Sequence, residues 1–152
     1  MMKILIGNDH AGTDLKFEIM KHLEEEGYEV INYGTDTNDR VDYPKVGEKV
    51  AEELVAGKGD LAVLICGTGV GITLAANKVP GIRAAVCSDT TTAHLVREHN
   101  HANIIGIGAR IVGVELAKDI VDSYLNATPM EGRHQERVDM ITAIEKKYTK
   151  EA

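Results

Sequence analysis

Five short apolar runs punctuate the chain, and each is nearly continuous instead of alternating with polar residues. They are rich in β-branched residues and occupy Lys3–Gly7, Tyr28–Tyr33, Leu61–Cys66, Arg83–Cys87 and Asn103–Ile107. Continuous apolar runs of this length are typical of strands that a parallel sheet buries on both faces. The pattern therefore predicts five strands of one parallel sheet.

The segments between these runs favour helices. Leu15, Ile19 and Leu23 recur at four-residue spacing and precede Gly27, a residue type that commonly ends helices. The further predicted helices run from Pro44 to Gly57, from Gly71 onward, from Thr90 to Glu98, through the stripe Ala117, Ile120, Val121 and Tyr124, and from near Arg137 to the basic Lys146 and Lys147.

Strands that alternate with helices predict βαβ units and hence an α/β fold. We expect residues 1–152 to form a single domain. It would be a three-layer αβα sandwich around a five-stranded parallel, doubly wound sheet of the Rossmann or flavodoxin-like kind, with a C-terminal helix. The polar segment Gly34–Tyr43 is rather long for a connection in such a fold, so we expect a mobile loop at its rim.

Composition and charge narrow the class of partner. The 152 residues are 43% hydrophobic, enough for one core, and carry a formal net charge of −7. A negative field and only 4% aromatic residues argue against nucleic acid and anionic membranes as partners. Two cysteines do not make a disulfide framework, and no apolar run approaches the ~20 residues of a membrane span. With no signal-peptide pattern at the N-terminus, we expect a cytoplasmic protein.

A glycine-rich loop is the strongest local signal of a binding site. In doubly wound sheets ligands bind beyond the carboxyl ends of the strands. There, after the third predicted strand, stand Gly67, Gly69 and Gly71, which leave backbone N–H groups uncrowded at the start of a helix. Such a loop can hold an anion or a developing oxyanion. It matches neither the Walker loop nor the dinucleotide fingerprint, and a tight turn without a ligand is the alternative.

Cys66 directly precedes this loop. A thiol at the N-terminus of a helix is favoured as the thiolate, so Cys66 is a candidate base or nucleophile. The alternative is a small buried hydrophobe at a strand end, which is also how we interpret Cys87. Thr68 is placed either to donate its hydroxyl to an oxyanion or to cap the helix.

Two polar residues, Asp9 and His10, follow the first predicted strand. A carboxylate beside an imidazole can move protons, and His10 can also hold an anion. The alternative is an N-cap aspartate next to a surface histidine.

His99 and Asn100 end the predicted helix that begins at Thr90. Because that helix starts at the carboxyl edge of the sheet and runs back, His99 should emerge at the opposite edge from Cys66. If the two act together, His99 must therefore come from a neighbouring subunit. The alternative is a histidine that interacts with the helix dipole.

Arg133 and Arg137 are four residues apart and would share one helix face. With Arg110 they can bind a phosphate through charge-assisted hydrogen bonds, or they can pair with Glu131 and Glu136 at the surface. No ligand spacing typical of a metal or a cofactor occurs, so we expect neither. The remaining histidines, His22, His94, His101 and His134, are interpreted as ordinary polar positions.

Seven motifs in order resemble the ribose-5-phosphate isomerase B family, which shares a superfamily with the galactose-6-phosphate isomerase subunits. They are Asp9-His10-Ala11-Gly12, Asp42-Tyr43-Pro44, Ile65-Cys66-Gly67-Thr68-Gly69-Val70-Gly71-Ile72, Ala75-Ala76-Asn77-Lys78, Gly81-Ile82-Arg83-Ala84, Glu98-His99-Asn100 and Gly132-Arg133-His134. The resemblance implies a metal-independent aldose–ketose isomerase of the pentose phosphate pathway that acts on ribose 5-phosphate and ribulose 5-phosphate. It also implies a homodimer or homotetramer whose active sites are shared between subunits.

The resemblance further implies a role for each matched residue. Cys66 resembles the base that removes the C2 proton, and His99 resembles the acid that opens the sugar ring. The loop Gly67, Thr68, Gly69, Val70 and Gly71 resembles the one that holds the enediolate. The residues that resemble substrate or phosphate contacts are Asp9, His10, Tyr43, Asn100, Arg110, Arg133 and Arg137.

Two departures from the family pattern lie outside these roles. His101 stands where relatives often carry an acidic residue, and Asn8 stands where Ser or Cys is common. They leave the sugar open, so a hexose 6-phosphate such as galactose 6-phosphate or allose 6-phosphate is an alternative substrate. A non-catalytic phosphosugar-binding module on the same fold is a second alternative.

Overall fold

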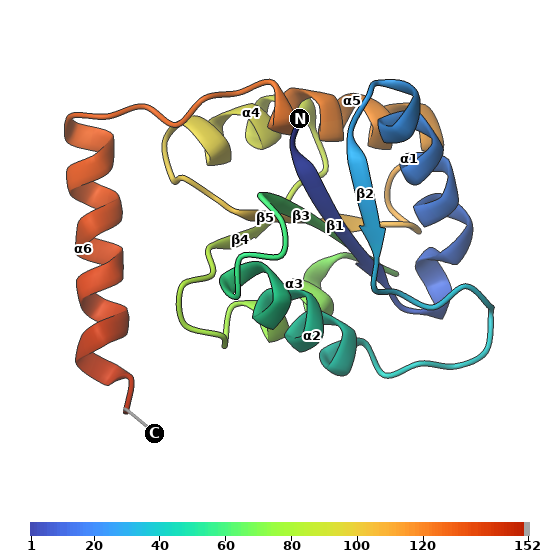
Figure 1. Cartoon of the computed structure of the whole chain (residues 1–152), viewed down its shortest axis with the longest axis horizontal. Coiled ribbons are helices and arrows are strands. Elements are labelled where there is room, and N and C mark those ends of the chain that lie inside the picture. Colours follow the sequence, from blue (N-terminus) through green and yellow to red (C-terminus); the bar gives the residue numbers. More distant parts are fainter. Residues whose placement is uncertain (151–152) are drawn as a thin grey trace.

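A computed structural model describes residues 1–150 and contains one five-stranded sheet within a three-layer arrangement (Figure 1). All strand pairs are parallel, in the order β2-β1-β3-β5-β4. The strands are β1 (Lys3–Asn8), β2 (Glu29–Asn32), β3 (Leu61–Cys66), β4 (Ala84–Val86) and β5 (Ile104–Gly108). The α/β class and the five parallel strands are thus confirmed. The order differs from the flavodoxin order in that the last two strands exchange places.

Helices connect the strands and cover both faces of the sheet. They are the short 3-10 helix η1 (His10–Gly12), α1 (Thr13–Glu25), α2 (Tyr43–Val55), α3 (Val70–Ala76), α4 (Thr90–Glu98), α5 (Val114–Leu125) and α6 (Arg133–Tyr148). One core cluster joins the sheet to α1, α4 and α5, and the other joins it to α2 and α3. Within residues 1–150, no helix combines the length and apolar character that crossing a membrane requires.

Burial separates the central strands from the edge strands. Nearly every residue of β1, β3 and β5 is buried, as continuous apolar runs predict for strands covered on both sides. The edge strands β2 and β4 are only partly buried and are shorter than their apolar runs, because each has a ladder on one side alone.

The last helix, α6, stands apart from the three layers (Figure 1). It begins at Arg133, so the predicted start near Arg137 is wrong by one turn. Gly132 precedes it with a φ of 66°, a conformation that glycine adopts without steric cost. Only His134 and Val138 of this helix are buried, and Met140, Ile141 and Ile144 are exposed. The helix therefore presents apolar side chains that the other residues of the range 1–150 do not cover.

Candidate active site

A crevice opens where the connections after two neighbouring strands leave the sheet on opposite faces. β1 is followed by α1 on one face, whereas its neighbour β3 is followed by α3 on the other face. The connections after these two strands diverge, which leaves a crevice beyond their carboxyl ends. Asp9 and His10 leave β1 at this point, and the loop from Cys66 to Gly71 leaves β3.

Cys66 is held beneath its own loop. The Gly69 N–H donates a hydrogen bond to Cys66 Sγ over 3.2 Å, which holds the sulfur under the loop. Cys66 is only 5% exposed, so little of the residue is open to solvent or to a ligand within one chain. The second cysteine, Cys87, is fully buried, and burial followed by the charge of Asp89 raises its pKa to about 12. Cys87 is thus the buried hydrophobe that its sequence context predicts.

Close packing dictates the glycines of the loop. Gly69 has a φ of 79°, and a Cβ placed there would lie 2.9 Å from the Ile107 backbone. A Cβ at Gly71 would lie 2.5 Å from the ring of Tyr43, so this glycine lets the aromatic side chain lie against the loop. A Cβ at Gly67 would approach the Arg110 guanidinium at 3.2 Å. Tyr43 and Arg110 therefore flank the loop.

The hydroxyl of Thr68 accepts a hydrogen bond from the Val70 N–H over 3.2 Å, so it caps α3 while the residue itself is exposed. The first amides of a helix have no partner within the helix. The Gly69 and Val70 amides are already bound to Cys66 and Thr68, so the next amides of α3 are the donors that this end offers to a negatively charged atom in the crevice.

A pocket of about 410 Å³ lies next to the loop. It is lined by Asp9, His10, Arg40, Val41, Asp42, Tyr43, Pro44 and Lys45. Asp9 stabilises the local fold, because its carboxylate caps η1 by accepting a hydrogen bond from the Ala11 N–H over 3.0 Å. The Val41 N–H donates to His10 Nδ1 over 3.1 Å, which leaves Nε2 as the protonated nitrogen of the neutral ring. His10 is thereby set to donate a hydrogen bond from Nε2.

Buried polar groups anchor the loop that forms the outer wall of this pocket. Asn8 Nδ2 donates to the Thr35 carbonyl over 3.1 Å, and the Thr13 hydroxyl donates to the Thr37 carbonyl over 2.7 Å. The ammonium of Lys16, whose side chain is fully buried, donates to the Thr35 carbonyl and to the Asp36 carboxylate. The predicted rim Gly34–Tyr43 is therefore tethered through its first half.

The remaining candidate residues lie at the opposite edge of the sheet. His99 caps the C-terminal end of α4 and stacks on His134 of α6, with ring centroids 4.2 Å apart and planes 2° from parallel. Burial lowers the pKa of His134, and the positive charges of His99, Arg133 and Arg137 lower it further. These effects favour the neutral form of His134.

Two contacts shape the turn that carries His99 and Asn100. Arg83 donates to the carbonyls of Asn100 and His101 over 3.1 Å, through Nε and Nη2 respectively. His101, with a φ of 50°, donates from Nε2 to the Met130 carbonyl over 2.7 Å. This buried histidine is not the ordinary polar position predicted for it, because it ties the turn to the segment leading into α6.

A single chain brings the predicted site residues together in two groups. Asp9, His10, Tyr43, the loop Cys66–Gly71 and Arg110 form the group at the carboxyl edge. His99, Asn100, Arg133 and Arg137 belong to the amino edge. From Ile104 to Gly108, β5 spans four residue steps, so the edges are ~13 Å apart at ~3.3 Å per residue. The predicted separation of His99 from Cys66 within one subunit is confirmed.

Sequence reasoning missed His134, Asn8 and Lys16. His134 belongs to the Gly132-Arg133-His134 motif, which was the available signal, but its stacking on His99 depends on how α6 returns to α4. Within residues 1–150, three side chains close enough to share a metal ion occur away from both groups, at His22, Glu26 and Asp122.

Comparison with known proteins agrees with this geometry. Residues 4–141 match the family model described as Ribose/Galactose Isomerase. The chain is 53% identical over 147 residues to ribose-5-phosphate isomerase B of Escherichia coli strain K12, covering 97% of this chain and 99% of that protein.

Solved structures agree as well. Ribose-5-phosphate isomerase B of Clostridium thermocellum has a TM-score of 0.96 and 56% identity, covering 97% of this chain and all (100%) of that one. The Mycoplasma genitalium enzyme, solved with bound ribulose-5-phosphate, has a TM-score of 0.90 and 40% identity, covering 95% and 96% of the two chains.

Proposed function

This chain belongs to the ribose/galactose isomerase family, and we propose that it interconverts D-ribose 5-phosphate and D-ribulose 5-phosphate. The observation that carries the proposal is the position of Cys66. Its sulfur lies under a glycine loop, accepts the Gly69 N–H and sits at the carboxyl edge where doubly wound sheets bind ligands. The enzyme is an aldose–ketose isomerase by this assignment.

The reaction needs a base and a group that stabilises an enediolate. In the open-chain aldose, the Cys66 thiolate takes the proton from C2, the C–H electron pair forms the C1–C2 double bond, and O1 gains the negative charge. The O2 hydroxyl proton then moves to O1, and the thiol returns its proton to C1 as the C2–O2 carbonyl forms, which gives the ketose and restores the thiolate. These steps use only side chains and backbone dipoles.

The loop after Cys66 supplies the electrostatic stabilisation. A proton next to a carbonyl becomes acidic only if the developing oxyanion is stabilised, and fixed N–H donors do this without reorganisation. We assign this role to the loop Gly67–Gly71, through its amides other than those of Gly69 and Val70, together with the Thr68 hydroxyl. His10, with its proton on Nε2, and Tyr43 are assigned to the sugar hydroxyls, and Asp9 assists ring opening.

We assign ring opening to His99 of a second subunit. Cys66 and His99 lie at opposite edges of the sheet, and a second chain that faces the crevice removes that separation. Arg133 and Arg137 share the exposed face of α6 beside His99, and with Arg110 they are assigned to the substrate and its phosphate. Asn100 follows His99 and is assigned to the same substrate.

The surface around α6 supports a homodimer, with a homotetramer as the larger alternative. A groove of about 490 Å³ lies between α6 and the β4 edge, and its apolar lining includes Ile82, Ala84, Ala85, Ile141 and Ile144. Exposed apolar side chains on an outlying helix are typical of an interface. A partner covering this groove would bury them and would complete each crevice with the partner's histidine and arginines.

We further propose that the chain acts as one domain in the cytoplasm. Both cysteines are free, and the Cys66 thiol must stay reduced to act as a base. A reducing compartment meets that requirement.

The test follows deuterium incorporation. Purified protein is incubated in D2O with ribose 5-phosphate and, separately, with galactose 6-phosphate and allose 6-phosphate, and NMR follows deuterium at C2 and formation of ketose. We expect exchange and ketose with ribose 5-phosphate, unchanged by a chelator. Exchange with a hexose phosphate alone would move the substrate to six carbons, and no exchange with any sugar would leave a binding module.

A further inference from the structure

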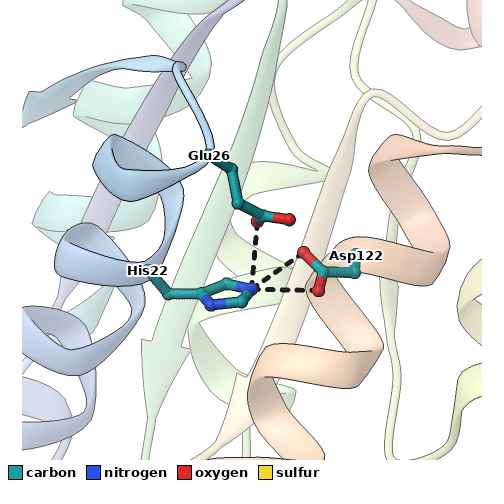
Figure 2. A group of neighbouring side chains, drawn as sticks. All are labelled: His22, Glu26 and Asp122. Carbon is teal, nitrogen blue, oxygen red and sulfur yellow. Dashed lines mark hydrogen bonds and ion pairs between the residues drawn. The ribbon is translucent and has the colours of Figure 1, made fainter.

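Three metal-ligating side chains meet between α1 and α5, away from the proposed active site (Figure 2). His22 lies in the last turn of α1, Glu26 caps that helix, and Asp122 comes from α5. His22 Nε2 lies 2.9 Å from both carboxylate oxygens of Asp122 and 3.0 Å from Glu26 Oε1. The imidazole thus points one nitrogen at two carboxylates.

The spacing of the ligand atoms suits a small divalent ion. One ligand atom from each residue can be chosen so that all lie within 4.8 Å of one another. Zinc binds nitrogen and oxygen at about 2.1 Å, so two of its ligands are at most about 4.2 Å apart and about 3.4 Å apart in a tetrahedron. Small side-chain rotations bring the three residues to that arrangement, since their side chains are 22–38% exposed and free to adjust.

The electrostatics of the cluster favour a cation. Within residues 1–150, neither Glu26 nor Asp122 pairs with a lysine or arginine, and Lys118 on α5 instead pairs with Glu18 and Glu115. Among residues 1–150 the two carboxylates therefore share one imidazole nitrogen as their ion-pair partner.

We propose that His22, Glu26 and Asp122 bind a zinc ion that joins the C-terminal end of α1 to α5. One imidazole and two carboxylates are a donor set for zinc, whereas magnesium and calcium prefer oxygen ligands alone. Water fills the fourth position. The ion cross-links two helices that pack on the same face of the sheet and takes no part in the isomerase reaction.

The chain offers a matched control. His94 and Glu98 on α4 have the same four-residue spacing as His22 and Glu26, with Nε2 3.1 Å from the carboxylate. Within residues 1–150, His22, Glu26 and Asp122 form a three-residue group of this kind, and the His94 pair does not extend to one. Both places therefore contain a histidine–glutamate pair on one helix. Among the described residues, only the pair on α1 has a third candidate ligand, Asp122.

The experiment measures zinc binding to metal-free full-length protein by titration calorimetry at neutral pH. The proteins compared are the wild type, His22→Ala, Asp122→Asn, His94→Ala and Cys66→Ser. We expect one zinc per chain in the wild type, retained by His94→Ala and Cys66→Ser, and weakened at least ~100-fold by His22→Ala and Asp122→Asn. Magnesium should give no comparable heat.

Hydrogen exchange supplies a second readout. Zinc should slow exchange in the last turn of α1 and in α5 of the wild type, and should leave both unchanged in Asp122→Asn, a near-isosteric variant expected to fold. Absence of zinc binding to the wild type would overturn the proposal. So would equal binding by His22→Ala, or loss of binding only in Cys66→Ser, because the ion would then sit in the crevice.

Discussion

At the carboxyl edge of the sheet the candidate side chains stand on close-packed backbone, whereas at the amino edge they stand on a turn and an outlying helix. The Cys66 loop has no room for a Cβ at Gly69 or Gly71. Arg133 and Arg137, by contrast, are exposed on a helix with two buried residues, His134 and Val138. The carboxyl edge is preorganised by its own chain, and the amino edge supplies groups whose proposed target lies on another chain.

The largest effect should come from the carboxyl edge. Cys66→Ala removes the proposed base, and because general base catalysis contributes ~10²–10⁴-fold, we expect kcat to fall by ~10³-fold or more. Affinity for ribose 5-phosphate should change little, as calorimetry can check. Cys87→Ala is the control for loss of a thiol, and near-normal turnover by Cys66→Ala would reject the assignment.

Mixing variants tests whether the two edges act across subunits. Cys66→Ala and His99→Ala should each be inactive alone. After subunit exchange of equal amounts, half of the dimers are mixed and each mixed dimer has one intact site, so roughly a quarter of wild-type activity should return. Exchange is verified independently with labelled subunits, and no recovery despite exchange would place both residues in one subunit's site.

At the amino edge the expected loss is mainly in binding. Arg137→Ala removes the proposed charge-assisted hydrogen bond to phosphate, which we expect to cost ~1.5–3 kcal/mol, or about 10–150-fold in affinity. Inorganic phosphate is a sufficient probe. Lys146→Ala, on the same helix but distant from His99, should behave as the wild type. Unchanged phosphate affinity in Arg137→Ala would contradict the phosphate role.

Backbone packing at the carboxyl edge is testable through stability. In Gly71→Ala the new Cβ would lie 2.5 Å from the Tyr43 ring, and overpacking of this kind costs ~1–3 kcal/mol. We expect a lower midpoint of chemical unfolding together with weaker substrate binding. Gly113→Ala is the comparison, because a Cβ there has nothing within 4 Å and φ is −77°. If Gly71→Ala and Gly113→Ala lowered stability equally, the Tyr43 ring would be able to move away from the new Cβ without cost, and close packing would not explain Gly71.

The smallest expected effect concerns acid stability of the tethered rim. The hydrogen bonds from Lys16 and then Asn32 hold the pKa of Asp36 below its usual 3.8. The folded-state pKa is the lower one, so this stabilisation is present above pH 3.8 and is lost as the pH falls through the folded value. Lys16→Met should reduce that acid dependence in unfolding curves, and an unchanged dependence would show that Lys16 does not stabilise the Asp36 carboxylate.

The sequence predicts the carboxyl edge better than the amino edge, for a physical reason. Local sequence determines where β3 and the following glycine loop begin and end. β3 is a run of six buried residues, and the loop after it has backbone positions that only glycine can occupy. The direction of α4 follows from the strand-helix alternation, so the separation of His99 from Cys66 could also be predicted.

Long-range contacts without a local pattern could not be predicted. The start of α6 at Arg133 depends on Gly132 and on the contact of His101 with Met130. The burial of Lys16 depends on a loop 20 residues away along the chain, and nothing distinguishes it from the solvent-facing lysines of other helices. The meeting of His22 with Asp122 joins residues 100 positions apart.

The partial anchoring of the rim loop has an evolutionary consequence. Its residues 35–37 are held by hydrogen bonds from Asn8, Thr13 and Lys16. Residues 40–42 line the pocket, and the stretch 38–42 makes fewer hydrogen bonds to the rest of the described chain. Insertions and substitutions at residues 38–40 can therefore accumulate without disturbing the core, whereas Val41 must keep its hydrogen bond to His10. A lineage carrying this scaffold can adapt to shorter or longer sugars by altering one short stretch of surface chain.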